Sequence, residues 1–173
     1  LNDYEHAINK KRKIYGELVG IGSAADLKGN YYITEKKDNG VGLQLAMERA
    51  LENAKIDEEQ IDCIISCANG SPEVDKAELN ALKAVFGEKL SSIWITCGKS
   101  YYGECHNVTS FFNQALALLT LKEQTIYQTL GLKGPEEGLK FALQKTTDEI
   151  NYVLCNCIYL NGNNTSVIFK RIE

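Results

Sequence analysis

The chain has 173 residues, of which 44% are hydrophobic and 24% charged, and its formal net charge is −4. These values are typical of one soluble globular domain with a sizeable core. The mildly acidic balance disfavours a nucleic-acid partner, and the basic run at residues 10–13 is expected to be a solvated turn. No apolar run reaches the roughly 20 residues that span a bilayer, and no signal peptide is present, so no membrane partner is expected.

The early part of the chain predicts a short helix over residues 3–13, a strand from Lys13 to about Gly22, and a polar loop over 29–39. A helix then opens at residues 38–40. Its apolar side chains recur with helical spacing, at Leu43, Met47, Ala50 and Leu51.

Strand-length apolar runs follow at residues 61–67 and 91–96. Between them, Asp75 and Glu78 have the spacing of a capping box at the start of a helix. An apolar helix is predicted over 108–121 and a looser segment over 124–148. The last strands, 150–160 and 165–172, are joined by a tight turn at 161–164. Strands that alternate with helices and end in a hairpin predict a layered α/β fold, one domain over 1–173.

Six cysteines offer a possible metal or redox site: Cys63, Cys67, Cys97, Cys105, Cys155 and Cys157. Most lie within hydrophobic runs, unlike the loop-rich frame of a secreted disulfide protein, so a reducing, cytoplasmic setting is predicted. The pairs 63/67 and 155/157 fall in predicted strands, whereas zinc ligands usually sit on loops or knuckles. Burial as small hydrophobic residues is the simpler interpretation, and neither a metal nor a cofactor is expected.

The stretch ITCGKSYYGECHN, residues 95–107, contains the Gly-Lys-Ser end of a phosphate-binding loop. That motif needs a glycine five residues before Gly98, and the chain has Ile93 there, within a predicted strand. The spacing therefore argues against a nucleotide site.

Several segments, taken in order, resemble the C-terminal half of a β-ketoacyl-(acyl-carrier-protein) synthase. They are KIYGELVGIGSAAD (13–26), Ile33-Thr34, SPEVDKAELNALKAVFG (71–87), Lys99-Ser to Gly103, and NCIYLNGNNTSVI (156–168). The resemblance implies the thiolase fold, in which two similar halves build a five-layered α/β core. It also implies that the nucleophilic cysteine lies in an N-terminal half absent from this chain. Because the chain starts at Leu1, we expect a processed or cut piece of something longer.

The resemblance also assigns the catalytic positions. The two family histidines, which stabilise the thioester oxyanion and assist decarboxylation of the malonyl extender, fall on Cys67 and Glu104 in this chain. The family lysine is retained as Lys99, and the gating phenylalanine becomes Leu160. No catalytic set is therefore intact. A thiol is a weak donor, and a carboxylate would repel both an oxyanion and a malonyl carboxylate.

Three further residues stand beside the altered position. If residues 104–109 begin a helix, His106 points to a different face from Glu104, which disfavours it as a substitute base. Tyr101 and Tyr102 are candidate stops in a tunnel wall, with core packing as the favoured alternative.

Loss of both histidines on a retained scaffold resembles a chain-length factor, the silent partner of a type II ketosynthase in polyketide, polyene or fatty acid biosynthesis. The partners this implies are a complementary N-terminal half, a catalytic ketosynthase subunit and an acyl carrier protein. Two alternatives remain: half of an active acyltransferase with unusual donors, and a purely structural assembly subunit.

Overall fold

The computed structural model describes residues 3–25, 39–159 and 162–172. The predicted loop at 29–39, apart from its last residue, the Ile33-Thr34 segment and the gate candidate Leu160 lie outside these ranges. Among the residues described, no helix is long and apolar enough to cross a membrane.

A six-stranded sheet organises the chain, in the order β1-β8-β7-β2-β3-β5. Strands β7, β2, β3 and β5 are parallel to one another, β8 pairs antiparallel with β7, and β1 pairs antiparallel with β8. The strand bounds are β1 Glu17–Ala25, β2 Cys63–Ile65, β3 Trp94–Thr96, β5 Lys140–Phe141, β7 Tyr152–Tyr159 and β8 Asn163–Lys170. The predicted C-terminal hairpin is confirmed, with Tyr159 opposite Asn163. The predicted mixed α/β fold is confirmed as well.

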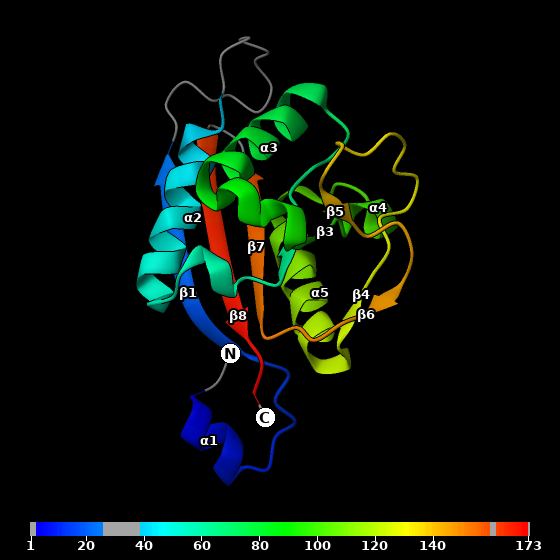
Figure 1. Ribbon diagram of the computed structural model, residues 1–173. Helices are drawn as coiled ribbons and strands as arrows, with labels where there is room; N and C mark the ends of the chain where they lie inside the picture. The colour runs from blue at the N-terminus through cyan, green and yellow to red at the C-terminus, as the bar shows by residue number, and fades with distance from the viewer. Residues whose placement is uncertain (1–2, 26–38, 160–161, 173) are drawn as a thin grey trace.

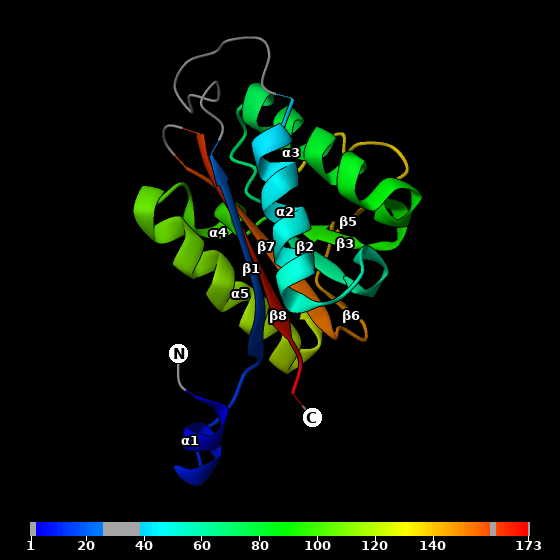
Figure 2. The same cartoon turned by 90° about the vertical axis from the view of Figure 1, so that its left-hand side faces the viewer.

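Helices cover both faces of the sheet (Figures 1 and 2). α2 (Val41–Ala54) and α3 (Pro72–Phe86) cover one face, and α5 (Thr109–Glu123) lies on the other. Because side chains alternate along a strand, neighbouring residues belong to different cores. Ile64 packs in the α2/α3 core, whereas Cys63 and Ile65 pack in the α5 core.

Two glycines bring β1 against α2. A Cβ atom on Gly22 would lie 1.9 Å from the carbonyl oxygen of Ala46, and one on Gly20 would lie 2.4 Å from that of Ala50. The glycines of the GELVGIGS segment therefore let a helix rest directly on the strand backbone. The strand itself begins at Glu17, four residues later than predicted, so residues 13–16 are not part of it.

The predicted capping box is wrong. Ser71 is the N-cap of α3 and Pro72 its first residue, so Asp75 and Glu78 already lie inside the helix. Proline suits that first position because no helical acceptor is available for an N–H there. Asp75 accepts a hydrogen bond from the backbone N–H of Asn69 at 2.9 Å, and Glu78 points into the core.

The segment predicted as loose, 124–148, contains three two-residue strands. β4 (Thr125–Ile126) pairs with β6 (Thr146–Thr147), and β5 extends the main sheet beside β3. At the other end of the chain, α1 (Tyr4–Asn9) lies apart from the sheet (Figure 1) and is shorter than the predicted helix.

Candidate functional site

The candidate site lies where the parallel strands β7, β2 and β3 end. Segments that follow parallel strands meet at the carboxyl edge of a sheet, which is the usual place for a ligand site in α/β proteins. Cys67 follows β2, and Lys99 begins the short helix α4 (Lys99–Tyr102) just after β3. Asn156 and Cys157 lie within the carboxyl half of β7.

A buried carboxylate, Glu78, holds the backbone of this edge. Its side chain accepts hydrogen bonds from the Ser66 hydroxyl at 2.6 Å, the Cys67 backbone N–H at 3.0 Å, and the Asn156 side-chain amide at 3.0 Å. The residue is only 2% exposed. A buried carboxylate is tolerated when its oxygens receive several donors, so Glu78 ties α3 to β7 and fixes the turn after β2.

Lys99 connects positions 67 and 104, to which the resemblance assigns the family histidines. Its ammonium group donates to the backbone carbonyl oxygen of Cys67 at 2.7 Å and to Oε2 of Glu104 at 2.7 Å. The lysine side chain is 7% exposed and that of Glu104 is 27% exposed. Positions 67 and 104, assigned from separate motifs, are thus brought together around the retained lysine.

Glu104 is held on its other oxygen as well. Oε1 accepts from the hydroxyl of Thr109 at 2.7 Å and from the backbone N–H of His106 at 2.9 Å. Thr109 in turn accepts from the Cys105 backbone N–H at 2.9 Å. The carboxylate is therefore a fixed acceptor and cannot act as a hydrogen-bond donor while it is ionised.

Three thiols around the site have raised pKa values. Burial raises the pKa of Cys67 well above the ordinary thiol value, and the nearby carboxylate of Glu78 raises it further. Burial also raises the pKa of Cys157, and raises that of Cys97 to about 11. Since the thiolate is the reactive species, Cys67 has the properties of a packed core residue.

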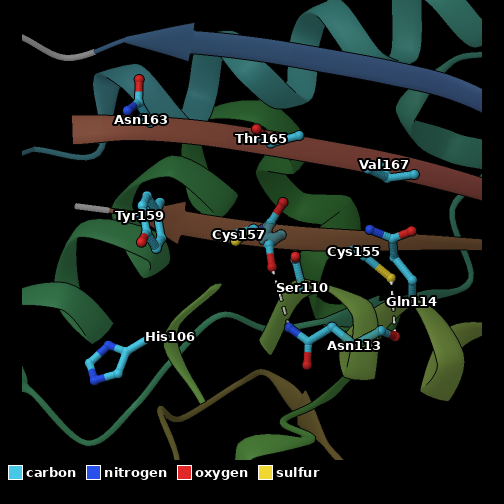
Figure 3. A pocket seen from close by; sticks show the side chains of 11 residues that line it. His106, Ser110, Asn113, Gln114, Cys155, Cys157, Tyr159, Asn163, Thr165 and Val167 are labelled. Atoms are coloured by element: carbon cyan, nitrogen blue, oxygen red, sulfur yellow. Dashed lines mark hydrogen bonds between the residues drawn. The ribbon is translucent and has the colours of Figure 1, made fainter. Parts of the chain in front are cut away.

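A cavity of about 380 Å³ opens between α5 and the β7–β8 hairpin (Figure 3). Asn113 donates from its side-chain amide to the backbone oxygen of Asn156 at 3.4 Å, and its own backbone oxygen accepts from the Cys155 thiol. Tyr159 and His106 lie at one end of the cavity in Figure 3. The lining is mostly neutral and polar: His106, Ser110, Asn113, Gln114, Cys155, Asn156, Cys157, Tyr159, Asn163, Thr165 and Val167.

The structure separates the two tyrosine candidates. The hydroxyl of Tyr102 is hydrogen-bonded to the side-chain oxygen of Asn113, and its ring packs 5.0 Å from that of Phe112. Tyr102 is thus engaged against α5, in line with core packing. The side chain of Tyr101 is 50% exposed. Of the two, Tyr101 has the larger surface available to a wall outside this chain.

His106 does not continue a helix from Glu104. It begins a 3-10 turn (His106–Val108) with a positive φ of 49°, and α5 starts only at Thr109. The premise that residues 104–109 begin one helix is therefore wrong. His106 is exposed and lines the cavity, and its backbone N–H donates a hydrogen bond to the Glu104 carboxylate.

Sequence reasoning missed Asn113, Asn156 and Thr109. All three are buried and their side chains bond to site residues. For Asn156 and Asn113 the available signal was a polar residue within an apolar run, in the strand VLCNCIY and the helix FFNQALALL. Thr109 carried no such signal. Among the residues described, no group of three or more possible metal ligands is found.

The comparisons with known proteins fit this geometry. Residues 15–133 match the family described as "Beta-ketoacyl synthase, C-terminal domain". The chain belongs to the β-ketoacyl synthase family. It is 33% identical over 176 residues to 3-oxoacyl-[acyl-carrier-protein] synthase 2 of Vibrio harveyi, covering 99% of this chain and 42% of that protein. It is 29% identical to the mitochondrial 3-oxoacyl-[acyl-carrier-protein] synthase of Arabidopsis thaliana, covering 99% and 38%.

Solved synthase structures share the fold at lower identity. A ketosynthase in complex with its type II polyketide acyl-carrier protein superimposes with a TM-score of 0.90 at 23% identity, covering 99% of this chain and 42% of that one. The ishigamide ketosynthase/chain length factor gives a TM-score of 0.85 at 20% identity, covering 98% and 41%. The chain thus spans about two-fifths of the length of these relatives, which corresponds to the C-terminal part of the synthase.

Proposed function

We propose that this chain is the C-terminal half of a catalytically silent, chain-length-factor-like subunit of a type II β-ketoacyl synthase. In this role it shapes the acyl-chain tunnel of a catalytic ketosynthase partner during polyketide, polyene or fatty acid biosynthesis. Neither family histidine position carries a group able to do the condensing chemistry, so this chain alone supplies no catalysis.

The Glu104 carboxylate bound to Lys99 at 2.7 Å is the observation that carries the proposal. A condensing site must place hydrogen-bond donors where negative charge develops in the transition state. At position 104 the chain instead places an acceptor that is already paired with the nearest cation. At position 67 it places a buried thiol whose pKa is raised. Neither residue therefore stabilises the negative charge that develops on the oxyanion.

The proposed partners are based on apolar side chains that are exposed on the α5 side of the sheet. Phe111 on α5 is 68% exposed and Phe112 is 43% exposed. On β1, Gly20 and Gly22 face α2, so Ile21 faces the α5 side, where it is 51% exposed. An apolar surface of this kind marks an interface. We assign it to the complementary N-terminal half, and the composite would pair with a catalytic ketosynthase and its acyl carrier protein in the cytoplasm.

The first test is a native mass spectrum of the complex purified from its source. We expect this chain, a complementary half and a full-length ketosynthase in one assembly. A homodimer that decarboxylates malonyl-carrier protein would contradict the silent role.

The second test separates a chain-length factor from a purely structural subunit. Tyr101→Ala and Tyr101→Trp should lengthen and shorten the product, respectively, because the exposed ring lies on the same short helix as Lys99, at the proposed tunnel wall. Tyr4→Ala, remote from the site on α1, is the matched control. An unchanged product length in both Tyr101 variants would favour the structural role.

An active synthase is the second candidate. The identity of 33% to a 3-oxoacyl synthase favours it, as does the position of His106 on the cavity wall. If His106 supplies the missing donor, the complex decarboxylates malonyl-carrier protein and His106→Ala abolishes that activity. If the subunit is catalytically silent, His106→Ala leaves the low background rate of decarboxylation unchanged.

A further inference from the structure

Three donors converge on the side chain of Glu104. Lys99 donates to Oε2, whereas Thr109 and the His106 backbone N–H donate to Oε1, all within 2.9 Å. An ammonium group, a hydroxyl and an amide arranged around two carboxylate oxygens form a complete carboxylate-binding site. The occupant of that site is a side chain of the protein itself.

The main donor does not depend on Glu104 for its position. The Lys99 ammonium is also anchored to the carbonyl oxygen of Cys67 at 2.7 Å. Glu78 fixes that backbone by accepting the Cys67 N–H, and is itself held by Asn156. The donor set is therefore built into the scaffold and should persist when the Glu104 carboxylate is removed.

Within the described residues, little space remains beside Lys99 for a second carboxylate. The cavity beside Lys99, Glu104 and Thr109 has a volume of only about 10 Å³. That is at or below the volume that holds a single water molecule. A free carboxylate can reach Lys99 only if the side chain of Glu104 leaves.

We propose that Lys99, Thr109 and the His106 amide form a receptor for a small carboxylate, and that Glu104 is its tethered ligand. Because the Glu104 side chain occupies the receptor, it keeps external carboxylates away from the buried lysine. On the proposed function above, on which this consequence rests, a carboxylate-bearing acyl group entering the site would meet a receptor that is already filled and neutralised.

The test removes the Glu104 carboxylate by mutation and supplies a free carboxylate in solution. Glu104→Ala deletes an acetate-sized part of the side chain. In the assembled protein, we expect acetate to raise the melting temperature of Glu104→Ala saturably, by about 2–5 °C. Sodium chloride at the same ionic strength should give no such rise. The wild type should respond equally to both salts.

Two variants sharpen the result. In Glu104→Ala/Lys99→Met the acetate effect should disappear, because the cation that binds it is gone. Glu104→Gln fills the same space without charge, so it should also show no acetate effect. The amide resonance of His106 should shift on acetate titration in Glu104→Ala only.

An acetate response equal to that of chloride in Glu104→Ala would overturn the proposal, as would a saturable acetate response in the wild type. If Glu104→Ala does not fold in chloride buffer, the folded yield in acetate becomes the readout, and equal failure in both buffers also overturns it. The outcome is independent of condensing activity. A complex that decarboxylates malonyl-carrier protein defeats the silent role without affecting the receptor.

Discussion

The side-chain amide of Asn156 donates to Oε1 of Glu78 across 3.0 Å, joining the middle of β7 to the second turn of α3. Asn156 is fully buried and also accepts from the Ser166 hydroxyl at 2.8 Å on β8. One carboxylate and one amide thus link a helix and two strands directly beneath the candidate site.

Glu78→Ala should lower the free energy of unfolding by about 4 kcal/mol, because it leaves three buried donors without an acceptor and opens a cavity. Glu78→Gln retains one acceptor oxygen and should cost about 1–2 kcal/mol. Urea unfolding followed by circular dichroism measures both. Exposed Glu52→Ala is the control and should change stability by less than about 0.5 kcal/mol. A Glu78→Ala value near that of the control would contradict the role of Glu78.

Gly22→Ala should be among the most harmful single changes in β1. Its Cβ would lie 1.9 Å from the Ala46 carbonyl oxygen, so α2 must move off the sheet. We expect a loss of about 3 kcal/mol in the free energy of unfolding. Ser23→Ala is the matched control, because Ser23 faces away from α2 and is exposed. Equal stability of the two variants would show that α2 does not rest on the strand backbone.

Local pattern predicted the elements with strong periodicity and missed those that depend on distant partners. The helix around Met47 and the hairpin that ends in β8 follow from spacing along the chain. In contrast, β4 exists because Thr125 pairs with Thr147, and β5 because Lys140 pairs with Trp94. Two-residue strands have no periodicity of their own, so the sequence of 124–148 predicts only a loose segment.

The candidate site also has features that the sequence predicts and features that it does not. The family resemblance assigned Cys67, Lys99 and Glu104 to one site, and the structure brings these residues together. The spacing of Asp75 and Glu78 suggested a capping box, but Pro72 starts the helix earlier and Glu78 turns inward instead. A pair of acidic residues near a helix start can cap the helix or lie inside it with one side chain buried. The position of the first helical turn decides between these two roles.

The buried thiols should resist alkylation in the folded protein. Burial raises the pKa of Cys63 and Cys67, and raises that of Cys97 to about 11, so the reactive thiolate form is disfavoured at pH 8. Iodoacetamide at pH 8 should label these three only after urea is added, with mass spectrometry of the peptides as the readout. The partly exposed Cys105 provides the internal comparison. Rapid labelling of Cys67 without urea would mean that it is a reactive thiol.

Phe111→Ser should weaken association with the complementary half. A phenylalanine side chain that becomes buried contributes about 2–3 kcal/mol, or roughly a 30- to 150-fold change in the dissociation constant. Leu143→Ser is the control, since Leu143 is 54% exposed and lies outside α5. Co-purification and size-exclusion chromatography of co-expressed halves measure the effect. Similar retention of both variants would place the interface elsewhere.

The single tryptophan reports on an ionisable contact at the far edge of the sheet. The indole N–H of Trp94 donates to Asp148 at 2.7 Å, and Lys140 lies 4.0 Å above the ring. The hydrogen bond from Trp94 lowers the pKa of Asp148 below the ordinary aspartate value. Because the folded-state pKa is depressed, the contact stabilises the fold above the unfolded-state pKa, and this contribution is lost as the pH falls through the folded-state pKa.

Trp94 emission should therefore stay constant as the pH is lowered through the ordinary aspartate range and change only below it. Asp148→Asn should alter the emission at neutral pH and remove the change in emission at acidic pH. Glu149→Gln, the neighbouring control, should retain the wild-type emission and the acidic change. Since Asp148 is largely exposed, its loss should cost less than about 1 kcal/mol at neutral pH. A step that persists unchanged in Asp148→Asn would show that another group causes it.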